Sequence, residues 1–160
     1  MNLYHGSYMQ ISQPKIITSN RLLDFGTGFY TTTDKDQAVK FTNKFMKLGK
    51  NRILNIYEYD EMAAKDKLSM MQLAEADIRW LHYVIANRSG SGKDNDFDIV
   101  MGPVANDRVY DVIESFELGD YSEDEALRRL LAFKLTNQIV FKTEKSLLYL
   151  KYSGYEQVEG

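Results

Sequence analysis

The chain has 160 residues, 44% of them hydrophobic and 12% aromatic, and this length fits a single domain covering residues 1–160. It has no cysteine, and its only histidines are His5 and His82. A disulfide framework, a thiol nucleophile, a zinc ribbon and a multi-histidine metal site are therefore excluded, and no metal is expected. No apolar run approaches the roughly 18 residues of a membrane span, and no basic segment followed by a hydrophobic one opens the chain. We therefore expect a cytoplasmic protein without a membrane partner.

The net charge of −3 is unevenly distributed along the chain. Residues 1–54 contain eight Lys and Arg against three Asp and Glu, and residues 128–160 contain six against three. The middle of the chain, residues 55–127, contains six against seventeen. A fold that joins the two ends is therefore expected to have one basic face.

The first third of the chain predicts short strands around one helix. Strands are expected at Asn2–Tyr4, Phe29–Thr32 and Arg52–Tyr59. Glycine, proline, serine and asparagine residues between 6 and 28 predict a loop. Apolar residues at three- and four-residue spacing predict a helix that Thr33 or Asp34 caps, that continues to about Leu48 and that Gly49 ends.

The rest of the chain alternates helices and strands. Helices are expected over 72–87, from the N-cap Asn106 to Phe116, and after a capping box at Ser122–Glu125. Strands are expected at Phe97–Met101, Gln138–Lys142 and Leu147–Tyr152, with a last pairing near Val158. Several short strands separated by helices predict an α+β domain. Lys93 follows Gly90-Ser-Gly92 as in a phosphate-binding loop, but Asp94 replaces the required Ser or Thr, which favours a plain flexible loop.

The N-terminal third carries the residues that best predict a binding site. His5 ends a predicted strand and is followed by Gly6, which places a polar side chain beside an accessible backbone amide. Tyr30 lies on the next strand and Phe41 eleven residues later on the following helix, and two such rings can form a slot for a flat heteroaromatic group. Taken singly, the three side chains are better interpreted as a core histidine, a strand tyrosine and a core phenylalanine.

Taken together, Tyr4-His5-Gly6-Ser7, Gly28-Phe29-Tyr30-Thr31-Thr32 and the aromatic residue at 41 resemble the signature of the ADP-ribosyltransferase superfamily, especially its diphtheria-toxin and PARP branch. More narrowly, the chain resembles the bacterial family DUF3990 in four segments: Leu3–Ser7, Asp24–Tyr30, Asp98–Asp107 and Asn137–Phe141. The resemblance implies an ADP-ribosyltransferase-like fold, in which two small facing sheets surrounded by helices hold NAD in a cleft between them.

The resemblance also implies how NAD would be held as a substrate. His5 would hydrogen-bond the adenine-side ribose, and the Gly6 backbone would hold the nicotinamide carboxamide. Tyr30 and Phe41 would stack on the nicotinamide ring. The family usually has a second tyrosine where this chain has Phe41, and PARP enzymes place a small hydroxyl residue where it has Ala38.

Three further residues are expected to contact NAD. Ser7 and Thr31 belong to the same two motifs. Arg21, in the loop between the motifs, is the candidate for contact with the NAD diphosphate, with an ordinary exposed surface charge as the alternative.

Gln138 takes the position of the superfamily's catalytic glutamate, so Gln138, His5 and Tyr30 are the predicted catalytic residues. Cleavage of the nicotinamide–ribose bond builds positive charge on the ribose, as in glycoside hydrolysis, and a glutamate places negative charge beside it. Gln138 keeps an acceptor but loses the charge and the basicity, a loss of about 3–5 kcal/mol, or 10²–10⁴-fold in rate. Glu144 could replace the charge, although it is better interpreted as a solvent-facing turn residue.

Three functions remain open at this stage. The leading hypothesis is an NAD-dependent mono-ADP-ribosyltransferase, the toxin of a bacterial toxin–antitoxin pair, with a protein or nucleic-acid acceptor and an antitoxin protein as partners. The second is a catalytically silent domain that binds NAD, ADP-ribose or a partner protein. The third is an ordinary α+β interaction module.

Overall fold

The computed structural model describes residues 1–16, 23–90 and 97–159 and confirms the α+β class. The strands of the described residues are β1 (Asn2–Ser7), β2 (Phe29–Thr32), β3 (Ile53–Tyr59), β4 (Met70–Gln72), β5 (Ile99–Pro103), β6 (Asn137–Phe141) and β7 (Leu150–Gln157). The helices are α1 (Lys35–Phe41), α2 (Asn43–Lys47), α3 (Glu61–Lys67), α4 (Ile78–Arg88), α5 (Asp107–Glu117), α6 (Glu123–Leu131) and α7 (Glu144–Leu147). The predicted flexible loop around Lys93 lies outside the described residues.

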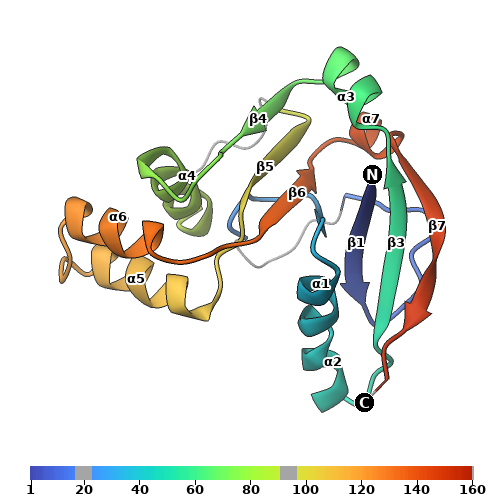
Figure 1. Ribbon diagram of the computed structural model, residues 1–160, viewed down its shortest axis with the longest axis horizontal. Helices are drawn as coiled ribbons and strands as arrows, with labels where there is room; N and C mark the ends of the chain where they lie inside the picture. The colour runs from blue at the N-terminus through green and yellow to red at the C-terminus, as the bar shows by residue number, and fades with distance from the viewer. Residues whose placement is uncertain (17–22, 91–96, 160) are drawn as a thin grey trace.

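The strands form one mixed sheet in the order β4-β5-β6-β2-β1-β3-β7. Among the described strands, only β4 and β5 pair in parallel. Figure 1 shows two wings, one of β4, β5 and β6 with α4, α5 and α6, the other of β1, β3 and β7 with α1 and α2. The prediction of two separate facing sheets needs correction, because pairing of Tyr4 on β1 with Thr32 on β2 joins the wings into one sheet.

The protein has two hydrophobic cores, and β5 and β6 contribute to both. Alternate side chains of a strand point to opposite faces, so Val140 joins one core while Ile139 and Phe141 join the other. The core around Val140 includes the fully buried Trp80 of α4. Gln138 lies two residues before Val140 and therefore faces the same side of the sheet, toward α4 and α5.

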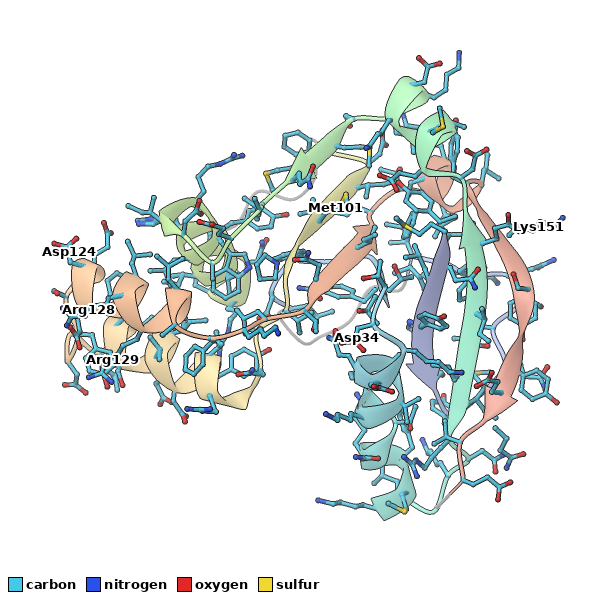
Figure 2. The ribbon with its side chains drawn as sticks, viewed as in Figure 1. Asp34, Met101, Asp124, Arg128, Arg129 and Lys151 are labelled. Atoms are coloured by element: carbon cyan, nitrogen blue, oxygen red, sulfur yellow. The ribbon has the colours of Figure 1, made fainter. Side chains whose placement is uncertain are left out.

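The predicted N-caps explain where three helices begin. The side chains of Asp34, Asn106 and Ser122 each accept a hydrogen bond from the backbone N–H three residues later, which satisfies a donor that the first helical turn leaves unpaired. The capping box predicted at Ser122 is only half formed. The Glu125 carboxylate instead pairs with Arg129 Nε at 2.8 Å; Figure 2 labels Arg129 near α5 and α6.

Several element boundaries differ from the predicted ones. The helix expected from 34 to 48 divides at Thr42 into α1 and α2, and the buried Thr42 hydroxyl donates to the backbone there and accepts from Arg52. The helix expected over 72–87 begins at Ile78, because β4 pairs with β5 just before it. The last strand begins at Leu150, after the unpredicted α7. Helix α3 was not predicted either. Within the described ranges, no helix has the length and apolar character needed to cross a membrane.

Candidate functional site

A cavity of about 660 Å³ lies between the two wings of the sheet. Residues of β1, β2, α1 and α2 line one part of it, and residues of β6, α4, α5 and two loops line another. In Figure 1, α1 and α2 lie on one side of β6, and α4 and α5 lie on the other. Six of the predicted site residues line this single cavity: His5, Gly6, Tyr30, Thr31, Phe41 and Gln138. They span most of the sequence, so the fold, and not chain proximity, brings them together.

The His5 ring is held in one orientation. Its Nδ1 lies 2.6 Å from the backbone carbonyl oxygen of Tyr30, which can only accept, so Nδ1 carries the hydrogen and donates. The ring also stacks on Phe29, with centroids 4.3 Å apart. Burial outweighs the hydrogen bond to Tyr30 and lowers the pKa of His5. The neutral ring therefore keeps Nε2 as a hydrogen-bond acceptor.

Gly6 lies where α1 approaches β1 most closely. A Cβ at this position would lie 2.4 Å from the Ala38 carbonyl oxygen and 2.9 Å from Thr42 Cγ2. A side chain at position 6 therefore cannot fit unless α1 moves. The absence of a side chain positions α1, and with it Phe41, at the cavity.

Tyr30 and Phe41 bring aromatic rings to the cavity in different ways. The Tyr30 hydroxyl donates to the Gly26 carbonyl at 2.6 Å and accepts from the Phe25 N–H at 3.0 Å, so the ring is anchored at its far end. Phe41 is 51% exposed, and Lys44 Nζ lies 3.7 Å from its ring centroid. The interpretation of Phe41 as a core residue is therefore wrong.

Gln138 lies on β6, between its neighbours Thr32 on β2 and Gly102 on β5. The residue is only 6% exposed, and its Nε2 has no hydrogen-bond partner in the described part of the chain. Leaving a buried donor unpaired costs about 1–3 kcal/mol. A ligand oxygen in the cavity would remove that cost, so the amide is well placed to hold a ligand.

Not every predicted site residue contributes a group to the cavity. Thr31 lines it, but its hydroxyl donates to a backbone carbonyl of β6 at 2.7 Å. Ser7 is not among the lining residues; it is buried at the end of β1, where its hydroxyl accepts from Met9 N–H at 3.4 Å. Arg21 lies outside the described residues. Glu144 is exposed at the start of α7 and does not line this cavity.

Sequence reasoning missed several lining residues, among them Asp24, Lys44, Arg88 and Tyr110. Asp24 belongs to a segment shared with DUF3990, but nothing in that segment indicates chemistry. Arg88 comes from the acidic middle of the chain, where the charge pattern predicts no cation at a binding site. Burial raises the pKa of Asp24, although the Tyr110 hydroxyl and the Arg88 charge act in the opposite direction.

No cluster of three metal-binding side chains occurs in residues 1–16, 23–90 and 97–159.

Comparison with known families gives a match over residues 1–152 to DUF3990, whose description is a protein of unknown function. The chain belongs to the DUF3990 family. No curated protein and no solved structure matches the chain.

The buried His5 makes a pH dependence expected for this DUF3990 protein. Because the pKa of His5 is lowered in the folded state, the unfolded chain binds more protons below about pH 6.5, and stability should fall as the pH falls. The slope contributed by one such group is at most about 1.4 kcal/mol per pH unit. Urea unfolding at pH 7.5 and 5.5 should show a larger loss for wild type than for His5→Asn, whose amide can replace the Nδ1 donor. Equal losses in the two proteins would contradict a neutral, buried His5.

Proposed function

We propose that this chain is an NAD-dependent mono-ADP-ribosyltransferase with an ADP-ribosyltransferase-like fold. The observation that carries the proposal is the convergence of His5, Gly6, Tyr30, Phe41 and Gln138 on one cavity. The division of the sheet into two wings with this cavity between them supports the same fold. The cavity volume, about 660 Å³, lies in the range of small-molecule sites.

The chemistry of the lining matches what NAD needs. The exposed face of Phe41 and the anchored ring of Tyr30 offer stacking surfaces for nicotinamide. The Nε2 atom of neutral His5 can accept from a ribose hydroxyl. The buried amide of Gln138 can hydrogen-bond the second ribose, where positive charge develops as nicotinamide leaves.

The proposal is tested by incubating the protein with NAD and measuring free nicotinamide. Release of nicotinamide above the buffer rate supports a transferase or an NAD hydrolase, and mass spectrometry of cell extract exposed to isotope-labelled NAD then identifies the acceptor. The alternative, a catalytically silent binder, is favoured by the uncharged Gln138. It predicts measurable NAD binding without nicotinamide release. Failure to bind NAD at millimolar concentration would contradict both and favour an interaction module.

Phe41→Ala is expected to weaken NAD binding by about 1–3 kcal/mol, because the variant loses the exposed stacking face. Since Phe41 is half exposed and outside both hydrophobic cores, the variant should fold normally. Phe41→Tyr is the matched control and should bind NAD like wild type. Calorimetry on the folded proteins makes the comparison, and equal NAD affinity in Phe41→Ala would place the nicotinamide ring elsewhere.

A role as the toxin of a toxin–antitoxin pair is part of the proposal and has a separate test. Induced expression of wild type in a bacterial host should arrest growth, whereas Gln138→Ala should not. Growth arrest by both proteins would separate toxicity from the proposed catalysis.

A further inference from the structure

The end of the cavity away from Phe41 is built around Arg88, the last residue of α4. The Arg88 guanidinium lies over the Tyr110 ring, 4.5 Å from its centroid. The Tyr110 hydroxyl donates to Asp24 Oδ2 at 3.0 Å, and the Asn87 side-chain amide donates to the Asp24 backbone carbonyl at 3.1 Å. Two adjacent residues of α4 therefore act on Asp24: Asn87 holds its backbone, and Arg88 places a positive charge near its carboxyl group.

Two buried nitrogen atoms of the cavity lining lack hydrogen-bond partners among the described residues. Among the described residues, Arg88 Nη1 is a buried nitrogen without a hydrogen-bond partner, and so is Gln138 Nε2. Both residues line the same cavity. Both atoms are donors, so the missing partner must offer acceptor oxygens.

The charges of the lining indicate the sign of that partner. Among the described lining residues, two side chains are basic, Lys44 and Arg88, and one is a carboxylic acid, Asp24. Burial raises the pKa of Asp24, which disfavours its negative charge. An arginine fork held over an aromatic ring is suited to bidentate binding of an oxyanion.

We propose that Arg88, positioned by Tyr110 and Asp24, forms a phosphate-binding subsite at this end of the cavity. The phosphoryl group has two possible sources, the diphosphate of NAD or a phosphate on the acceptor. This proposal deepens the proposed function, and it rests on that function only for the identity of the phosphoryl compound. The oxyanion itself is indicated by the unpartnered Nη1 of Arg88 and by the two basic side chains among the described lining residues.

The subsite is tested by calorimetric titration of the full chain with inorganic pyrophosphate. Arg88→Met removes the charge and keeps an unbranched side chain over Tyr110, and it should weaken pyrophosphate binding about 10- to 100-fold, the effect of losing hydrogen bonds to a charged group. Lys44→Met removes an equal charge at the Phe41 end and should weaken it less than about threefold. Arg88→Lys keeps the positive charge but lacks the guanidinium fork, so its pyrophosphate affinity should lie between those of wild type and Arg88→Met. Thermal unfolding of each variant checks that it is folded.

Two further binding measurements, with NAD and with nicotinamide riboside, identify the source of the phosphate. If Arg88→Met weakens NAD as much as pyrophosphate but spares nicotinamide riboside, which has no phosphate, the subsite binds the NAD diphosphate. If pyrophosphate binds without displacing NAD, and Arg88→Met leaves NAD binding unchanged, it binds the acceptor's phosphate. Wild type that binds pyrophosphate through Arg88 but neither binds NAD nor releases nicotinamide would retain the subsite and overturn the proposed function. No binding of pyrophosphate to wild type, or equal binding to folded Arg88→Met, would overturn the subsite.

Discussion

Replacing Gln138 by glutamate is expected to raise the rate of NAD hydrolysis by about 10²–10⁴-fold. The carboxylate would lie beside the ribose carbon at which positive charge develops, and it would give an attacking water a general base. The rate of nicotinamide release from NAD in wild type and Gln138→Glu measures the effect. A Gln138→Glu protein no faster than wild type at any pH would contradict the placement of this residue beside the reacting ribose.

The burial of position 138 adds a pH dependence to this prediction. Gln138 is 6% exposed, and burial raises the pKa of a carboxyl group because it disfavours the charged form. The introduced glutamate is therefore expected to be partly protonated near neutral pH. The gain in hydrolysis should grow as the pH rises, until the carboxyl group is fully ionised.

Gln138→Ala is the loss-of-function variant that complements Gln138→Glu. Gln37→Ala is its matched control, because Gln37 also lines the cavity. The Gln37 Oε1 accepts from the hydroxyls of Thr32 and Thr136, whereas Gln138 Nε2 has no partner among the described residues. Gln37→Ala should therefore lower stability by about 1 kcal/mol with little effect on turnover per folded molecule. Gln138→Ala should abolish turnover with little effect on stability. If nicotinamide release persists at the wild-type rate in Gln138→Ala, Asp24 becomes the candidate, because it is the carboxyl group among the described lining residues and Glu144 lies elsewhere.

The sequence predicted the parts of the fold that depend on local patterns. The caps at Asp34, Asn106 and Ser122 form hydrogen bonds to residues only three positions away. The strand at Phe29–Thr32 was predictable because its residues are aromatic or β-branched. The single sheet was not predictable in this way. It depends on the pairing of Tyr4 with Thr32, a contact between distant residues that no periodicity encodes.

The residues of the candidate site also differ in whether a local sequence pattern or long-range packing determines them. His5, Gly6, Tyr30 and Phe41 were found because their order and spacing along the chain resemble a known signature. Arg88 was missed because it acquires its surroundings only when the end of α4 packs beside α5 and the loop that contains Asp24. A helix-ending arginine in an acidic stretch is otherwise indistinguishable from a solvated surface charge.

Gly6→Ala is expected to lower the free energy of unfolding by about 3 kcal/mol, the upper part of the range for overpacking a well-packed contact. The added Cβ would lie 2.4 Å from the Ala38 carbonyl oxygen, and a backbone atom of a helix cannot move away as a flexible side chain can. Relief of the clash must displace α1 from β1. Urea unfolding measures the loss, and NAD calorimetry on the remaining folded protein should show weaker binding, since α1 carries Phe41.

Gly49→Ala separates this clash from the general effect of replacing a glycine. Gly49 has a φ of +67° and nothing within 4 Å of the added Cβ. Its replacement should therefore lower the free energy of unfolding by only about 1–2 kcal/mol, the cost of a left-handed backbone conformation for a residue with a side chain. Gly49 also lies outside the cavity lining, so NAD affinity should not change. The requirement for glycine at position 6 thus follows from the packing of α1 on β1 whether or not NAD binds. A Gly6→Ala protein that unfolds like wild type but fails to bind NAD would show instead that the residue is needed for the ligand alone.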